Sequence, residues 1–423
     1  MQVLPRSGED LAEALQIAFV RLSDPHDGGM IGAMAQMPPD PGDRFADVPL
    51  LREIQRVLLS GSGPINWELA RQIGIAAATW GREDPPLAEE DQRSFEGATR
   101  MAELAVADHT GLPAPIDVTR VRTVRRAEWV EANVHGLREL FEPGAERLAR
   151  ALSEAQAREA PDHLEAPGML GAVLNQMAPL LVGAQVGAVI GSLGQRVLGQ
   201  YEIPLPRRSE PALLYVAPNI AELERQWSLP TDQFRAWVAL HETAHAFQMG
   251  QPWVRDHFLS LIQEVASGLD FDLSALEDRL EGLDMSDPQR LAEALGRPGE
   301  LLESSLNDEQ RLLLRRIQAF MAAAEGHAEH VMSSVGRRIL GSYDRIDEAM
   351  RRRHEGRSEE ERAVERMLGI DLKLEQYRLG RAFCERVVEL TDEPTLSRMW
   401  RDAESLPSMP ELEEPTLWLS RIA

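Results

Sequence analysis

Apolar residues recur at three- and four-residue spacing along most of the chain, which is the period of an amphipathic helix. This pattern predicts helices at 67–108, 126–151, 309–338, 359–368 and 375–390. Strand signals are few. The best is ALLYV at 212–216, an apolar run of strand-forming residues that ends before a Pro-Asn pair. We therefore predict a mainly α, multi-helical fold with a small β-sheet beside the helix that follows this strand.

A membrane span is the competing interpretation of one apolar segment. Residues 166–195 include no charged side chain and are long enough to cross a bilayer. Polar residues interrupt the segment, however, and Gly183, Gly187 and Gly191 recur every fourth residue, which leaves one helix face open to a close neighbour. We predict a buried helical hairpin here and no stable membrane span.

Composition and charge narrow the class of protein. The chain has 423 residues, of which 43% are hydrophobic, and a formal net charge of −24. It can bury a large core, and its negative charge argues against nucleic acid as a partner. The single cysteine, Cys384, excludes an intramolecular disulfide and a cysteine-based zinc site. The first residues do not resemble a secretory signal, so we expect a cytoplasmic protein.

The candidate chemistry lies in the stretch VALHETAHAFQ. A helix is predicted from Thr231, as N-cap, to Gly250, and it places His241 and His245 on one face, four residues apart. Two imidazoles at this spacing can bind one Zn²⁺, and Glu242 lies near enough to act as general base on a water. The alternative is a pair of buried histidines satisfied by hydrogen bonds, and a five-residue match can also arise by chance.

The spacing of residues in the sequence does not by itself identify the third metal ligand. A histidine six residues after His245 is excluded, because Gln251 stands there. His257 and Glu264 on the next helix are possible ligands. Another candidate is MAAAEGHAEHVM, in which Glu325 and Glu329 share a helix face. A carboxylate-bridged di-iron site would need a second Glu-x-x-His pair, and the sequence has none.

The pairing of HETAH with EGHAE resembles the gluzincin arrangement of metallopeptidases. The resemblance implies that Glu325 is the third zinc ligand and that Glu329 accepts the N–H of His241. The separation of about 80 residues between His245 and Glu325 is longer than in common gluzincins. An acidic insertion at about 270–310 would account for it, and Glu264 is the fallback ligand.

A longer series of motifs resembles a bacterial zincin-like family of zinc-dependent hydrolases that is common in actinobacteria. The motifs are WELARQIGIAAA, RAEWVEANV, the GAQVGAVIG run, LGQYEIPLP, YVAPNI, WVALHETAHAFQ, EGHAEHVM and EQYRLGRAF. They extend from about residue 63 to the C-terminus. The domain expectations are a loosely ordered arm at 1–62, a helical region at 63–165, and a zincin-like metal-binding domain at 166–423 whose proline-punctuated tail is extended.

Other roles are less specified by the sequence. Tyr377 and His354 are candidates to stabilise the oxyanion, although ordinary helix packing is the favoured interpretation of Tyr377. His327 and His330 are expected at the surface or next to the metal ligands. The expected function is a zinc-dependent hydrolase acting on peptides or proteins. The alternative is a zincin scaffold without turnover that serves binding or regulation. Neither the substrate nor the oligomeric state follows from the sequence.

Overall fold

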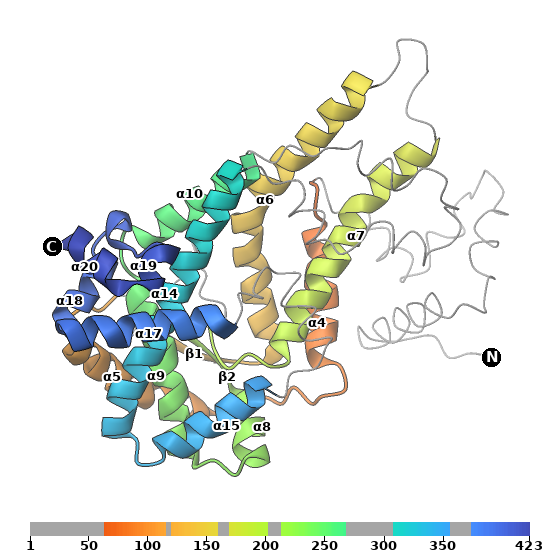
Figure 1. The fold of residues 1–423 in the computed structure, drawn as a ribbon. Helices are drawn as coiled ribbons and strands as arrows, with labels where there is room; N and C mark the ends of the chain where they lie inside the picture. The colour runs from red at the N-terminus through yellow and green to blue at the C-terminus, as the bar shows by residue number, and fades with distance from the viewer. Residues whose placement is uncertain (1–62, 116–119, 160–168, 202–212, 268–307, 356–373) are drawn as a thin grey trace, which may run out of the picture.

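The computed structural model describes residues 63–115, 120–159, 169–201, 213–267, 308–355 and 374–423, and most of them are helical (Figure 1). The elements in chain order are α4 Trp67–Thr79, α5 Glu89–Thr110, β1 Val121–Val124, α6 Arg126–Glu159, α7 Met169–Gly194, β2 Leu213–Val216, α8 Ala217–Gln226, α9 Thr231–Met249, α10 Val254–Ser267, α14 Asp308–Ile339, α15 Tyr343–Glu355, α17 Leu374–Leu390, α18 Glu393–Ser397, the short 3₁₀ helices η1 Arg398–Trp400 and η2 Ala403–Ser405, α19 Met409–Glu413 and α20 Pro415–Ile422.

A small parallel sheet separates two hydrophobic cores. Strand β1 pairs with β2 in the register Val121 to Leu213, and Gly199 forms an antiparallel bridge to Tyr215 on the other side of β2. All four residues of β2 are buried. Leu213 and Tyr215 pack into the core around α5 and α9, whereas Leu214 packs with Trp129 of α6 into the other. Burial on both faces explains the continuous apolar run, and the predicted strand is confirmed.

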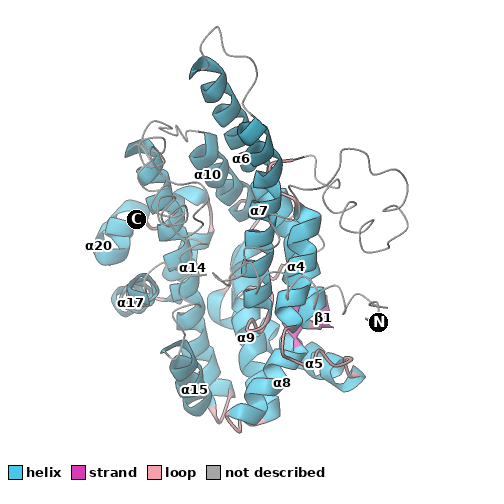
Figure 2. Cartoon of the chain, turned by 90° about the vertical axis from the view of Figure 1, so that its right-hand side faces the viewer, coloured by secondary structure: helices cyan, strands magenta, loops and turns pink. Residues whose placement is uncertain are grey.

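The glycine series is confirmed as a helix-packing face, but the predicted hairpin is wrong. Residues Met169–Gly194 form the single helix α7, with Pro179 inside it. A Cβ added at Gly187 would lie 2.5 Å from the carbonyl oxygen of Ala70, so only glycine allows α4 to approach this closely. Both views show α4 lying along α7 (Figures 1 and 2). Within the described ranges, no helix has both the length and the apolarity needed to cross a membrane.

Most predicted helices are confirmed with shifted ends. The pattern at 67–108 is divided into α4 and α5, and the helices expected at 126–151, 309–338 and 375–390 are α6, α14 and α17. The expectations for 1–62, 359–368 and most of the acidic insertion at 270–310 lie outside the described residues. Elements on both sides of the boundary expected at residue 165 pack together, since β1 pairs with β2 and α4 with α7.

Two local predictions are wrong. The C-terminal tail is helical and not extended, because Ser408 and Glu411 form a reciprocal capping box and prolines occupy first-turn positions of α19 and α20, where no intrahelical N–H bond is lost. Helix α9 begins at Thr231 itself. Its N-cap is Pro230, which makes no side-chain cap bond.

Helices α14 and α17 cross at two glycines. A Cβ on Gly326 would lie 2.1 Å from the carbonyl carbon of Gly380, so the two backbones touch at this point. Phe320 of α14 and Phe383 of α17 belong to a third core that also holds Trp400 and Trp418 from the C-terminal segment. The crossing fixes the part of α14 that contains the EGHAE sequence.

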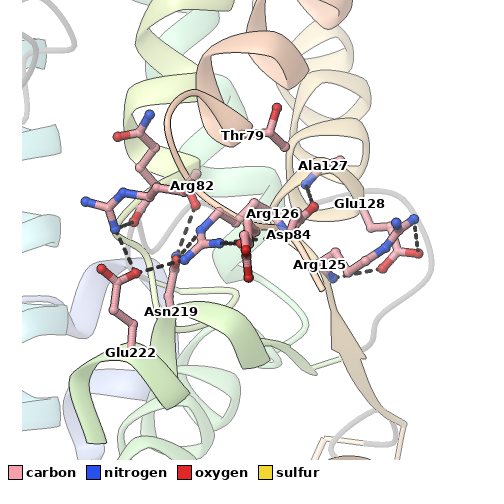
Figure 3. A network of polar contacts seen from close by, with 12 residues as sticks. Thr79, Arg82, Asp84, Arg125, Arg126, Ala127, Glu128, Asn219 and Glu222 are labelled. Atoms are coloured by element: carbon pink, nitrogen blue, oxygen red, sulfur yellow. Dashed lines mark hydrogen bonds and ion pairs between the residues drawn. The ribbon is translucent and has the colours of Figure 1, made fainter. Parts of the chain in front are cut away.

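A buried arginine joins the carboxyl ends of both strands (Figure 3). Arg126 is the first residue of α6, two positions after the end of β1, and is 2% exposed. Its Nε donates to Oδ1 of Asn219, which follows β2, over 2.6 Å, and its Nη2 donates to Glu222 over 3.0 Å. Asn219 in turn donates to the carbonyl oxygens of Gly194 and Val197 at the end of α7. One guanidinium therefore holds the sheet, α7 and α8 together.

Removing this arginine should destabilise the fold. We expect Arg126→Ala to lower the free energy of unfolding by about 3 kcal/mol, because it leaves buried acceptors without donors. Denaturant titration measures the effect. Arg125→Ala is the matched control, since the side chain of Arg125 is 42% exposed and pairs with Glu128 one turn on. Equal stability of the two variants would contradict this role of Arg126.

Candidate metal centre

Helix α9 carries the His-Glu-Thr-Ala-His sequence and packs against α5 and α14. The four-residue spacing brings the rings of His241 and His245 together, with centroids 4.7 Å apart and planes at 86°. The ring of His241 stacks on Trp237. His245 is fully buried, and burial, followed by the nearby His241, lowers the pKa of His245 well below its ordinary value. His245 is therefore neutral near pH 7, which is the form that binds a metal.

Helix α14 brings the carboxylate of Glu325 close to the ring of His245. Its Oε2 lies 3.7 Å from Nε2 of His245, and its side chain is 16% exposed. Two ligands of a tetrahedral zinc ion with bonds of about 2.0–2.1 Å lie about 3.3 Å apart, so this pair needs little movement to share an ion. The long separation in sequence is thus closed by the packing of α14 against α9.

Gln248 determines which ring nitrogen of His245 carries the proton. Its Nε2 donates to the carbonyl oxygen of Ala324 over 3.0 Å and lies 2.9 Å from Nδ1 of His327. The amide oxygen must then be the atom that faces Nδ1 of His245, at 3.0 Å. An amide oxygen only accepts, so Nδ1 of His245 carries the proton and Nε2 keeps its lone pair toward Glu325. This is the arrangement that orients a metal-binding histidine.

The surroundings of His245 fit a ligand of the zinc ion that the motif implies. Nε2 of His245 is buried, and it makes no hydrogen bond to any residue in the described ranges. A buried polar atom of this kind is costly unless it has a partner, and a metal ion is such a partner. Two imidazoles and one carboxylate form a ligand set that zinc accepts, with a fourth position left for water.

Glu242 is held by the chain segment that pairs with β2. It is 1% exposed, and its Oε2 accepts the backbone N–H of Tyr201 over 2.7 Å. Gly199 lies against its carboxyl group: a Cβ added at Gly199 would be 2.2 Å from the carboxyl carbon. The carbonyl oxygen of Gly199 accepts the indole N–H of Trp129, which fixes this segment from the other side. The carboxylate therefore has one defined position.

A side chain at residue 199 should displace Glu242. We expect Gly199→Ala to cost about 1–3 kcal/mol of stability through overpacking and to lower any hydrolytic activity, with zinc still bound. Gly97→Ala is the control, because a Cβ there has no neighbour within 4 Å. Thermal unfolding and zinc content measure the two effects. If the melting temperature and activity of Gly199→Ala were unchanged, the segment around residue 199 would have moved to accommodate the added methyl group.

Three further candidates, Glu329, Tyr377 and His354, lie on α14, α17 and α15. Burial raises the pKa of Glu329, and Arg381 opposes this shift. The orienting of His241 by Glu329 stays a prediction. Tyr377 lies on α17, one turn before the crossing at Gly380, and its side chain is outside the described residues. The same holds for the His354 side chain at the end of α15, so the oxyanion roles of both stay predictions.

The fallback ligands make contacts within helix α10 or with the residue just before it. Glu264 is exposed and accepts a hydrogen bond from Ser260 over 2.8 Å, and His257 packs on Trp253. The surface alternative for His327 and His330 is wrong, because they are 2% and 5% exposed. Burial lowers the pKa of His327 to about 3, and through Gln248 it contacts the His245 network. His330 instead pairs with Glu393.

The sequence interpretation missed two contributors. Gln248 lies on the same stripe as both histidines, one turn after His245, and that spacing is a signal for a side chain that can reach the His245 ring. The backbone N–H of Tyr201 had no signal, because its role depends on the pairing of Gly199 with β2. Main-chain donors of this kind become visible only in the fold.

Comparison with known proteins places the chain in a family. The profile of the zincin-like metallopeptidases matches residues 65–419. A solved structure of a provisionally assigned hydrolase with a novel fold, from Chloroflexus aurantiacus, is 31% identical with a TM-score of 0.60 and covers 85% of this chain and 98% of its own. No curated protein matches. These findings support a metal-dependent hydrolase, and the chain belongs to the zincin-like metallopeptidase family.

Proposed function

We propose that the protein is a zinc-dependent hydrolase, and specifically a peptidase, whose ion is held by His241, His245 and Glu325. The observation that carries the proposal is Nε2 of His245. This atom is buried and makes no hydrogen bond among the described residues. Because Nδ1 donates its proton to Gln248, Nε2 carries a lone pair and no proton. It faces the Glu325 carboxylate at 3.7 Å. An imidazole arranged in this way needs a cation.

The chain's own groups have distinct roles. When bound, zinc lowers the pKa of a coordinated water and polarises the carbonyl of the bond to be cleaved. Glu242 accepts the proton of the attacking water and passes it to the leaving amine. The N–H of Tyr201 holds the carboxylate in place for this transfer. Tyr377 would donate to the oxyanion from α17, which crosses α14 beside Glu325.

One observation favours a second function. Glu242 and His245 are 1% and 0% exposed, so a substrate reaches them only if covering groups move. A zincin scaffold that keeps its metal without turnover, and acts in binding or regulation, would have the same burial. Activity therefore separates the two functions.

A peptide-library experiment tests the proposal. The zinc-loaded protein is incubated with a mixture of peptides, and the products are read by mass spectrometry. We expect cleavage that stops after removal of zinc and returns on its addition. A fully zinc-loaded protein that cleaves no peptide or ester substrate would favour the binding scaffold.

The role of Gln248 gives a separate prediction. We expect Gln248→Leu to weaken zinc binding at this site by about 10–100-fold, because Nδ1 of His245 loses its acceptor. Gln251→Leu is the matched control: Gln251 is also buried, and its amide donates to the carbonyl oxygen of Phe247. Competition with a fluorescent zinc chelator measures both affinities. Equal affinities would show that Gln248 only packs.

A further inference from the structure

A second group of possible ligands lies away from the α9 motif, where α5, α14 and α18 meet. His109 is in the last turn of α5, His330 is on α14, and Glu393 is the first residue of α18. One ligand atom from each lies within 4.8 Å of the other two. None of these residues belongs to the His-Glu-Thr-Ala-His site.

Both imidazoles converge on one carboxylate oxygen. Nε2 of His330 lies 2.7 Å from Oε1 of Glu393, and Nε2 of His109 lies 3.4 Å from the same atom. The second distance matches the spacing of about 3.3 Å between two ligands of a tetrahedral zinc ion. The first is a hydrogen-bond distance and has to open slightly to admit an ion. The two rings are tilted at 31°, with centroids 5.9 Å apart.

The cluster contains buried ring nitrogens without partners. Nε2 of His109 and Nδ1 of His330 are buried, and neither makes a hydrogen bond within the described part of the chain. A buried polar atom without a partner is costly. A cation shared with Glu393 would supply a partner for Nε2 of His109.

We infer that His109, His330 and Glu393 form a second metal site that takes a divalent transition-metal ion of the zinc class. Two imidazoles and one carboxylate suit such ions better than magnesium or calcium. The site links three helices that are far apart in sequence. It therefore serves to fix the C-terminal helices to α5 and α14, which is the role of a structural metal.

Nearby contacts support a structural role. Ser397 of α18 donates to the carbonyl oxygen of Thr110 at the end of α5 over 2.6 Å, so these helices already touch beside the cluster. His330 is 5% exposed, which leaves little access for a substrate. The cluster also shares helix α14 with Glu325, and His327 between them contacts Gln248. A metal here would steady the helix that presents Glu325.

Metal analysis of matched variants tests this site. Proteins purified with zinc and dialysed free of excess are measured by elemental analysis: wild type, His109→Ala, Glu393→Gln and His241→Ala. We expect two zinc ions per wild-type chain and the loss of one in each variant. His109→Ala combined with His241→Ala should lose both. Ser397→Ala is the control, because it loosens the same helix contact without removing a ligand.

The outcomes separate this inference from the proposed function. If His109→Ala and Glu393→Gln keep all the zinc that the wild type holds, there is no second site. If His241→Ala alone keeps its zinc, the proposed catalytic site fails and the second site stands. A thermal melt controls for misfolding: zinc should raise the melting temperature of His241→Ala, and this rise should be absent when His109→Ala is combined with His241→Ala. A rise of equal size in both would overturn the structural role.

Discussion

Glu242→Gln is expected to keep its zinc and to lose at least about a hundredfold of any peptide hydrolysis, because general-base catalysis contributes about 10²–10⁴-fold. Glutamine has nearly the same shape, and its amide oxygen can still accept the N–H of Tyr201, which Glu242 now accepts over 2.7 Å. What it lacks is the capacity to take a proton. Initial rates on a cleaved peptide, together with zinc content, measure the two effects.

Glu264→Gln is the control for this substitution. Glu264 is an exposed carboxylate on α10 that contacts Ser260, and it should be replaceable without effect on rate or metal. If Glu242→Gln retains full activity, Glu242 is not the base. If it loses zinc, Glu242 holds the metal instead of the water. Each result would contradict the proposed role.

His245→Ala is expected to abolish zinc binding at the α9 site. It removes the ligand that Gln248 orients and leaves Glu325 without the imidazole 3.7 Å away. Since the variant also opens a buried cavity, His241→Ala is a second test, because this residue is only partly buried. Both should lose one zinc ion per chain by elemental analysis and should no longer be stabilised by zinc at this site.

His257→Ala supplies the matched control for the ligand variants. His257 is a histidine on the following helix, partly buried against Trp253, and it was a possible third ligand by spacing alone. Its removal should leave the zinc content unchanged. Loss of zinc in His257→Ala, with retention in Glu325→Gln, would show that the third ligand comes from α10.

Helical elements were the most predictable part of the fold. Helix α9 could be located from the stripe that ends in Gln248, and the glycines of α7 indicated a close neighbour. That neighbour, α4, could not be named, because the face of a helix does not say which helix covers it. The C-terminal helices could not be predicted from the prolines, because proline breaks the interior of a helix, whereas Pro410 and Pro415 occupy first-turn positions.

The metal-binding residues likewise include some that the sequence predicts and some that only the fold brings together. His241, Glu242 and His245 share one helix, so local spacing was enough to predict their association. Glu325 was reached through the gluzincin resemblance, and the structure places it beside His245. The cluster of His109, His330 and Glu393 had no signal: its residues come from three helices, and no spacing within the sequence links them. Tertiary packing alone brings such groups together.

The most direct test of the central claim is X-ray diffraction from crystals of the zinc-loaded protein, recorded above and below the zinc absorption edge. The two data sets locate the ion without reference to activity. We expect an anomalous peak in contact with Nε2 of His245 and a carboxylate oxygen of Glu325, with His241 as the third protein ligand. A zinc-loaded crystal with no peak between α9 and α14 would contradict the assignment, even if zinc were found elsewhere in the chain.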